Sequence, residues 1–421
     1  MEQKSDKYIL VVEDSQMFSR ILKRSIESVE HFKVVIAESF AELKAILSEN
    51  KYQFFAGLLD VNLPDAPNGE VIDYVLEHDI TSVVFTGKLD ENFRKKIYKR
   101  GIVDYVLKEG PSNVEYMVSL LKQLDRNQNL NVLVVDDSSS ARSYIKHLLL
   151  IYQFNVYEAS DGIEALSVLE ANNIHLVLTD FYMPNMDGLE LTKKIRTTYS
   201  SQEVAIIGMS VFGNNKLSAH FLKLGGSDFI TKPFLEEEFF CRINQNMELL
   251  EHIRELKYLA TKDHLTGLYN RRYLFEQGKA LIDASHEKET SVAVALLDVD
   301  FFKHVNDEHG HDIGDKVLFK LGSILLNQFH APHIVSRYGG EEFCLVLSDI
   351  TEQESFDLLD GLRELIAEHC FTLDNGDILQ MTVSIGVHTS RIDNLKDALK
   401  RADQGLYQAK HEGRNQVVLI K

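Results

Sequence analysis

Two stretches of the chain, residues 8 to about 125 and 132 to about 250, repeat the same order of apolar and polar positions. In each stretch, short apolar runs typical of buried strands alternate with longer segments of helical periodicity. Each stretch opens with an apolar run that ends on two acids, Ile9 to Asp14 in the first and Val132 to Asp137 in the second. Strands that alternate with helices predict a doubly wound parallel sheet, so we expect two tandem domains of the α/β class.

An aspartate, a hydroxyl residue and a lysine then follow in the same order in both stretches, each at the end of a predicted strand. They are Asp60, Thr86 and Lys108 in the first stretch and Asp180, Ser210 and Lys232 in the second. The carboxyl ends of parallel strands meet at one edge of a sheet, so these residues and the paired acids should converge. Clustered carboxylates bind Mg²⁺, one of them can accept a phosphoryl group, and the lysine and hydroxyl would hold the phosphoryl oxygens.

This pattern resembles the receiver domains of response regulators, which are phosphorylated by a histidine kinase. The resemblance implies a role for six residues of the second stretch: phosphoacceptor Asp180, metal-binding Asp136 and Asp137, and switch residues Ser210, Phe229 and Lys232. The corresponding residues of the first stretch are Asp60, Glu13, Asp14, Thr86, Tyr105 and Lys108. The first stretch has Lys108-Glu109 in place of Lys232-Pro233 and one extra residue between Asp60 and Gly69. We therefore expect Asp180 to be the principal phosphorylation site and Asp60 a second one.

The last third of the chain has a different pattern. Val292 to Leu297 reads as a buried strand that runs into Asp298, Asp300 and Lys303. Downstream, residues 334–336 and 343–347 read as the arms of a hairpin whose turn contains Gly339, Gly340, Glu341 and Glu342. Glycines let a nucleotide approach the backbone, carboxylates bind a hard cation, and lysine binds phosphate. The pattern therefore predicts a site for Mg²⁺ and a nucleoside triphosphate.

These motifs resemble GGDEF-domain diguanylate cyclases over residues 258–421. Four further segments carry the resemblance: Asp263 to Arg272, Asn306 to Asp315, Val383 to Val387 and Ala402 to Asn415. The resemblance implies an α/β nucleotidyl-cyclase-like domain that condenses two GTP into cyclic di-GMP and releases two pyrophosphates. One such domain holds one GTP, so the reaction requires a homodimer.

The resemblance also implies which residues form this site. The metal, Mg²⁺ or Mn²⁺, would be held by Asp298, Glu341 and the Val299 carbonyl, and Glu341 and Glu342 would be the catalytic acids. The substrate-binding residues would be Lys303, Lys410 and Arg414 on the phosphates, His311, and the two glycines Gly339 and Gly340. Asn306 and Asp315 would read guanine, because a carboxylate accepts from guanine N1–H whereas adenine has no donor at N1. Many cyclases carry a product-inhibition motif, Arg-x-x-Asp, before the turn; here it is replaced by His330-Ala331-Pro332-His333, so we expect no strong product inhibition there.

The expected boundaries are receiver 1 over residues 1–126, receiver 2 over 130–250 and the cyclase domain over 258–421, with a helical linker over 236–262 that overlaps the end of receiver 2. In this linker, Leu249, Ile253, Leu256 and Ala260 recur at spacings of four, three and four, as in a coiled-coil seam. An ordinary receiver helix that packs on its own core is the alternative, and one continuous helix could serve both roles.

Composition narrows the classes of partner. Among 421 residues, 45 basic and 64 acidic ones give a net charge of −19, which argues against binding of a nucleic-acid backbone. Cys241, Cys344 and Cys370 have neither disulfide nor metal spacing and are expected to be buried apolar residues in a reducing compartment. No apolar run approaches the ~18 residues that span a bilayer, so we expect a cytoplasmic protein without a membrane partner.

Three other functions remain open on the sequence alone. The output domain could be an enzymatically silent module that binds GTP or cyclic di-GMP, although the intact carboxylates argue against it. It could make a mixed purine dinucleotide, which Asp315 disfavours. The chain could also be a phosphorelay scaffold, which would leave the C-terminal motifs without a role.

Overall fold

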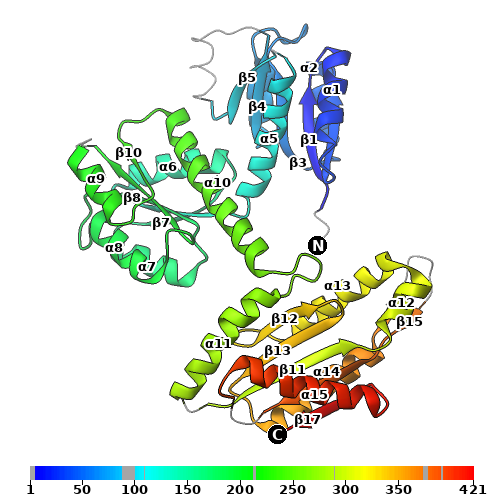
Figure 1. The fold of residues 1–421 in the computed structure, drawn as a ribbon. Helices are drawn as coiled ribbons and strands as arrows, with labels where there is room; N and C mark the ends of the chain where they lie inside the picture. The colour runs from blue at the N-terminus through cyan, green and yellow to red at the C-terminus, as the bar shows by residue number, and fades with distance from the viewer. Residues whose placement is uncertain are drawn as a thin grey trace. The chain divides into compact units, whose positions relative to one another are not determined.

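A computed structural model describes residues 5–87, 100–108, 110–211, 215–288, 290–372, 378–389 and 392–421. The chain divides into two compact units, Met1–Glu251 and His252–Lys421 (Figure 1). The first unit holds two five-stranded parallel sheets and the second a five-stranded mixed sheet, so the predicted fold class is confirmed.

The first sheet has the strand order β2-β1-β3-β4-β5, with every described pairing parallel. Its strands are β1 Lys7–Val12, β2 Phe32–Ala37, β3 Phe54–Asp60, β4 Ser82–Thr86 and β5 Asp104–Leu107. Its described helices are α1 Gln16–Ile26, α2 Phe40–Ser48, α3 Glu70–Leu76 and α5 Pro111–Asn127. Apolar side chains pack on both faces of this sheet, which explains why its strands read as continuous apolar runs.

The second sheet repeats this order as β7-β6-β8-β9-β10. Its strands are β6 Asn131–Val135, β7 Asn155–Ala159, β8 Leu176–Asp180, β9 Ala205–Ser210 and β10 Asp228–Thr231. Its helices are α6 Ser139–Ile151, α7 Gly162–Ala171, α8 Gly188–Thr198, α9 Asn215–Lys223 and α10 Glu236–Thr261. Side-chain caps start several of these helices: Ser138, Asp161 and Asp187 each accept a hydrogen bond from a backbone N–H of the first turn.

Helix α10 is continuous from Glu236 to Thr261 and so spans almost all of the segment expected as a helical linker, whose role as a linker stays a prediction. Its first half packs on the receiver core through Phe239, Phe240, Ile243, Met247 and Leu250. Leu249 and Leu256, two positions of the expected seam, are 58% and 65% exposed. The first half of the helix therefore packs on its own receiver, while two apolar residues of the expected seam are exposed to solvent. The coiled coil itself stays a prediction.

The mixed sheet of the second unit has the order β12-β13-β11-β16-β17. Its strands are β11 Val292–Val299, β12 Ile334–Gly339, β13 Glu342–Ser348, β16 Val383–His388 and β17 Val417–Ile420, and a separate hairpin joins β14 Cys370–Thr372 to β15 Ile378–Gln380. The helices are α11 Arg271–Lys288, α12 Phe302–His309, α13 His311–Gln328, α14 Glu352–Glu368 and α15 Leu395–His411. Helices α13 and α14 cover one face of the sheet, and α11 and α15 cover the other (Figure 1).

The hairpin predicted around the two glycines is confirmed, with Ser336 paired to Cys344 and Arg337 to Phe343. The expectation that all three cysteines are buried is wrong for two of them. Cys344 lies in the core of the sheet, but Cys241 and Cys370 are exposed. Cys241 is not among the buried residues of α10, and Cys370 precedes the buried Phe371, so its side chain points to the opposite face of β14.

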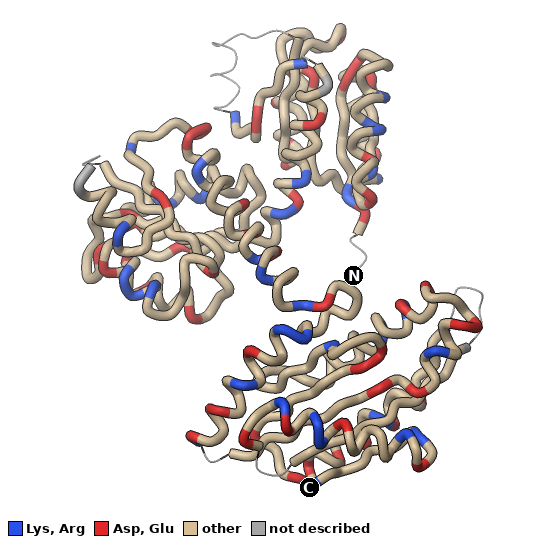
Figure 2. Tube along the Cα trace, viewed as in Figure 1, with Lys and Arg blue, Asp and Glu red and all other residues tan. Residues whose placement is uncertain are grey.

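Basic and acidic residues are both spread over the described elements of the two units (Figure 2). The absence of a nucleic-acid partner, expected from the net charge of −19, stays a prediction. Among the residues that the structure describes, no helix is both long enough and apolar enough to cross a membrane.

Candidate active sites

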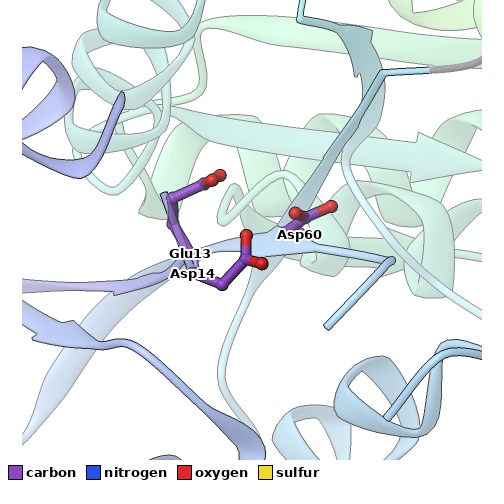
Figure 3. A group of neighbouring side chains, drawn as sticks. All are labelled: Glu13, Asp14 and Asp60. Carbon is purple, nitrogen blue, oxygen red and sulfur yellow. The ribbon is translucent and has the colours of Figure 1, made fainter. Parts of the chain in front are cut away.

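The first receiver brings its predicted acids together at the carboxyl edge of the sheet. Glu13 and Asp14 follow β1 and Asp60 ends β3, and an oxygen of each lies within 4.8 Å of the others (Figure 3). Lys108, directly after β5, places its Nζ 2.6 Å from Glu13 and 2.7 Å from Asp60. The carboxylate trio can hold a divalent cation, and the lysine is placed to bind an oxygen on Asp60.

The charges in this cluster depend on one another. Burial raises the pKa of Glu13, while its hydrogen bond to Lys108 acts in the opposite direction. Burial also disfavours the charged form of Lys108, but hydrogen bonds to Asp60 and Glu13 outweigh this effect and raise its pKa. The ammonium therefore stays charged and offsets the repulsion between the two carboxylates.

The second receiver has the same lysine bridge. Lys232 Nζ lies 2.6 Å from both Asp136 and Asp180. Backbone N–H groups of Ser138 and Tyr182 donate to the same two carboxylates, at 2.9 Å each, and fix their direction. Asp137 is exposed, as is its counterpart Asp14 in the first receiver. Unlike the first receiver, however, the second has no close trio of these three acids among the described residues.

The predicted switch residues lie at the strand ends where they were expected. Thr86 ends β4 and Ser210 ends β9, and both are buried. Tyr105 in β5 is buried, and Phe229 in β10 packs its ring against Phe181 at 5.3 Å. Residues 88–99 and 212–214, which follow the two hydroxyl residues, lie outside the described part of the chain.

In the second unit, the acids expected to bind metal meet at the end of β11. Asp298 is paired across the sheet with Glu342, and the Val299 N–H donates to the Glu341 carbonyl at 3.4 Å. Lys410, in the last turn of α15, places Nζ 2.8 Å from Asp298. Burial raises the pKa of Asp298 to about 6; Lys410 acts in the opposite direction, and the charges of Glu341 and Glu342 raise it further. Three carboxylates with a single close ammonium form a site with spare negative charge for a cation.

Two other cationic residues of the predicted phosphate site lie near this edge. The Arg414 guanidinium lies over the ring of Phe301, 4.3 Å from its centre. Phe301 is the residue that directly precedes α12. Lys303 is exposed in the first turn of α12. Asp300, in contrast, is saturated by Thr382, Ser384 and the Asn415 N–H, so it ties the β11–α12 turn to its neighbours.

The predicted base-reading residues lie on α12 and α13. The Asn306 Oδ1 atom is buried and has no hydrogen-bond partner among the residues that the structure describes. A Cβ at Gly314 would lie 2.0 Å from that oxygen, so only glycine leaves it in place. Asp315 and His311 are exposed on α13. A buried acceptor without a partner costs stability unless a ligand donates to it, which fits a donor-bearing base at this position.

Two tertiary ties were not foreseen from the sequence. Arg337 donates to the Gly340 carbonyl at 2.8 and 3.0 Å and to Asp263 at 3.2 Å, so one guanidinium holds the glycine turn on the segment that follows α10. His333 Nδ1 accepts a hydrogen bond from the Ser348 N–H at 3.2 Å, so it supports the start of the hairpin. The position of Arg337, two residues before Gly339, was the one feature of the sequence that could have indicated the first of these contacts.

Replacement of Lys232 by Met should destabilise the second receiver, because it leaves two carboxylates together without a cation. Breaking a buried pair of this kind should lower the Tm by roughly 5 °C or more in EDTA. Mg²⁺ should restore most of that loss, and differential scanning fluorimetry with and without Mg²⁺ measures both effects. The control is Lys194→Met, which removes an exposed pair with Glu190 on α8. Equal losses for the two variants would contradict the interpretation.

Two protein-family models match the segments of the chain in which the three sites lie. The model of the response regulator receiver domain matches residues 9–119 and 132–244. The model of the GGDEF domain of diguanylate cyclases matches residues 260–416. The three matched segments contain the three sites described above.

Two curated relatives match more than half of the chain. The response regulator PleD of Caulobacter vibrioides is 31% identical over 297 residues, which cover 68% of this chain and 65% of PleD. Diguanylate cyclase A of Treponema denticola is 30% identical over 245 residues, covering 55% of this chain and 65% of that protein. The match thus spans slightly less than two thirds of either relative.

A solved structure assigned to a two-component system response regulator/GGDEF domain protein has 38% sequence identity and a TM-score of 0.53, and the match covers 58% of this chain and all of that one. The receiver matches alone take in more than half of the 421 residues. The chain therefore belongs to the response regulator family, with two receiver domains followed by a GGDEF domain.

Proposed function

We propose that this chain is a diguanylate cyclase regulated by phosphorylation, which condenses two GTP into cyclic di-GMP and two pyrophosphates. The observation that carries the proposal is the convergence of Asp298, Glu341 and Glu342 with Lys410 at one strand end. The family matches and the relatives support it. We also propose the boundaries 1–126, 130–250 and 258–421 for the three domains, with 236–262 as the overlapping linker.

The metal of this reaction would be Mg²⁺, or Mn²⁺, held by Asp298, Glu341 and the Val299 carbonyl. These are the hard oxygen donors that such ions take, and the cluster has more carboxylates than nearby ammonium groups. When bound, the ion would supply charge compensation for the triphosphate in the transition state. Glu341 would also help to deprotonate the attacking 3′-hydroxyl, and Glu342, next to Asp298 across the sheet, would keep the local potential negative.

The chain's own cations would orient the triphosphate. Lys410 contacts Asp298 and can exchange this carboxylate for a phosphate oxygen, while Lys303 and Arg414 flank the same turn. Without side chains, Gly339 and Gly340 would let the nucleotide approach the backbone. Gly340 also has a φ of +28°, a conformation that residues with a Cβ rarely adopt. These groups would hold the α-phosphorus in line with the attacking hydroxyl.

Guanine would be read between α12 and α13. The unpartnered Asn306 Oδ1 would accept from an amino group of the base, and the Asp315 carboxylate from N1–H and the exocyclic amine. His311, the first residue of α13, would contact the substrate from the same side. A buried acceptor such as Asn306 Oδ1 selects a base that can donate to it, because the wrong base would leave it unpaired.

Two output domains would have to face each other, because each holds one GTP and the reaction joins two. The exposed seam residues of α10 support a homodimer through this helix. A histidine kinase would phosphorylate Asp180 and, secondarily, Asp60, each beside its lysine and hydroxyl. The GTP and kinase requirements place this chemistry in the cytoplasm.

Incubation of the chain with GTP and Mg²⁺, with and without beryllofluoride, tests the proposal directly. We expect cyclic di-GMP as the product by mass spectrometry, a rate that responds to beryllofluoride, and a loss of at least about 100-fold for Glu341→Gln. Glu354→Gln, in a capping box of α14, is the control and should keep the rate. A chain that binds GTP but forms no dinucleotide would be a silent module instead.

Gly314→Ala should raise the KM for GTP by about 10-fold or more while kcat changes less, because the new methyl group displaces Asn306 from the base site. Steady-state kinetics with GTP measures the two constants separately. Gly361→Ala on α14, where a Cβ meets no atom within 4 Å, controls for a general effect of the substitution. An unchanged KM in the Gly314 variant would remove Asn306 from the base site.

At limiting Mg²⁺, the rate should rise as the pH increases through about 6 and level off above 7. Burial raises the pKa of Asp298 to about 6, so below that pH this carboxyl carries the proton that Mg²⁺ must displace. Saturating Mg²⁺ should flatten the profile, because the ion favours the deprotonated form. Rates measured from pH 5 to 8 at two Mg²⁺ concentrations check this; a profile that is flat at limiting Mg²⁺ would contradict the role of Asp298.

A further inference from the structure

The C-terminal end of α6, in the second receiver, forms hydrogen bonds with two strands of the first receiver. The Tyr152 hydroxyl, at the C-cap of α6, donates to the Val103 carbonyl at 2.7 Å, and both residues are buried. Its neighbour Gln153 donates from Nε2 to the Phe55 carbonyl at 3.0 Å. Two adjacent residues of one receiver thus bind the backbone of the other.

The contacted strands are those that carry the phosphorylation chemistry of the first receiver. Phe55 lies near the start of β3, which ends on Asp60. Val103 directly precedes β5, after which comes Lys108, the residue that bridges Glu13 and Asp60. The contact and the acidic site therefore lie at opposite ends of the same two strands, and β4 holds these strands in one sheet.

On its other side, Tyr152 packs on the helix that leads to the output domain. Its ring stacks on Phe240 of α10, with centroids 3.5 Å apart and planes at 19°. Helix α5 of the first receiver also contacts α10, because Arg126 at the end of α5 pairs with Glu251 of α10. Tyr116 of α5 is also close to α10: burial raises its pKa, and the charges of Asp104 and of Cys241 and Glu237 on α10 raise it as well. One apolar cluster includes residues of both receivers around these contacts, so the region is a continuous packed core.

We propose that Tyr152 couples the phosphorylation state of the first receiver, at Asp60, to the position of helix α10. This inference rests on the proposed function, because it assigns the first receiver a separate route to the output domain. The three linked contacts are Lys108 with Asp60, Val103 with Tyr152, and Tyr152 with Phe240.

The physical basis is the exchange of partners at Lys108. A phosphoryl group on Asp60 adds negative charge and acceptor oxygens beside the Lys108 ammonium. The ammonium should then move from Glu13 to the phosphoryl oxygens. Lys108 directly follows β5, so a shift of this residue moves a short strand whose other end is preceded by Val103. Loss of the hydrogen bond would leave the buried Val103 carbonyl without its donor, which costs stability, so the Tyr152 hydroxyl should move with Val103. Phe240, which stacks on the Tyr152 ring, should then shift as well.

The test uses the full chain in two backgrounds, Asp180→Asn, in which only Asp60 can respond to beryllofluoride, and Asp60→Asn, in which only Asp180 can. Tyr152→Phe is introduced into each, since it removes the hydroxyl and keeps the ring on Phe240. The matched control is Tyr199→Phe, which removes a hydroxyl that donates to the Leu169 carbonyl at 3.4 Å within the second receiver. Two quantities are measured with and without beryllofluoride: the rate of cyclic di-GMP formation, and amide hydrogen exchange over residues 236–250.

In the Asp180→Asn background, Tyr152→Phe should reduce the beryllofluoride effect on the rate by about fivefold or more and abolish the change in exchange at α10. The basal rate and the response through Asp180 should stay within about twofold of the parent. A residue with only a structural role would lower both responses alike, and that result would overturn the proposal. The proposal would also be overturned if the rate of the Tyr152→Phe variant still responded to beryllofluoride at Asp60. The same holds if hydrogen exchange in α10 of the parent did not change when beryllofluoride binds at Asp60. If no chain forms cyclic di-GMP, the proposed function fails, while the exchange data still decide the coupling.

Discussion

Buried carboxylates gathered at a strand end repel one another, and in all three domains a lysine from a late element of the domain offsets that repulsion. Lys108 bridges Glu13 and Asp60, Lys232 bridges Asp136 and Asp180, and Lys410 pairs with Asp298. Lys108 and Lys232 directly follow the last strands of their receiver sheets, and Lys410 lies on α15, the last helix of the output domain. The acids, in contrast, come from the first strand of the domain or from a neighbour of that strand in the sheet. Each site therefore joins groups from an early and a late part of its domain, so it is complete only in the folded domain.

The same pairs make the sites responsive. A bridging ammonium can be exchanged for a divalent cation, or can move to the oxygens of a phosphoryl group or a triphosphate, without leaving a carboxylate uncompensated. In the output domain the balance is tilted further, because burial raises the pKa of Asp298 to about 6 while Glu341 and Glu342 add negative charge. Ligand binding at each site then changes the partner of a lysine, and the receiver lysines lie at the ends of strands that run through the domain core.

Much of this arrangement could be predicted from the sequence, because strand-end acids and lysines in a parallel sheet converge on one edge by topology alone. Asp136, Asp180 and Lys232 are the clearest case: three separated segments meet within hydrogen-bond distance as expected. The hairpin around Gly339 and Gly340 followed from its alternating pattern and its glycines.

Contacts that depend on tertiary placement could not be predicted in this way. Arg337 reaches Asp263 across 74 residues, and Tyr152 reaches Val103 across 49, through side chains whose direction no periodicity specifies. The saturation of Asp300 by Thr382 and Ser384 and the exposure of Cys241 have the same origin. Whether the acids of the second receiver form as close a trio as Glu13, Asp14 and Asp60 also depends on side-chain placement and not on spacing.

The most direct test of the shared lysine–carboxylate design is a crystal structure of the chain with Mg²⁺ and a nonhydrolysable GTP analogue. The design predicts Mg²⁺ at about 2.1 Å from oxygens of Asp298 and Glu341, with Lys410 moved from Asp298 to a phosphate oxygen and the base beside Asn306. A nucleotide bound elsewhere, or a Lys410–Asp298 pair that stays intact with Mg²⁺ and nucleotide present, would contradict it.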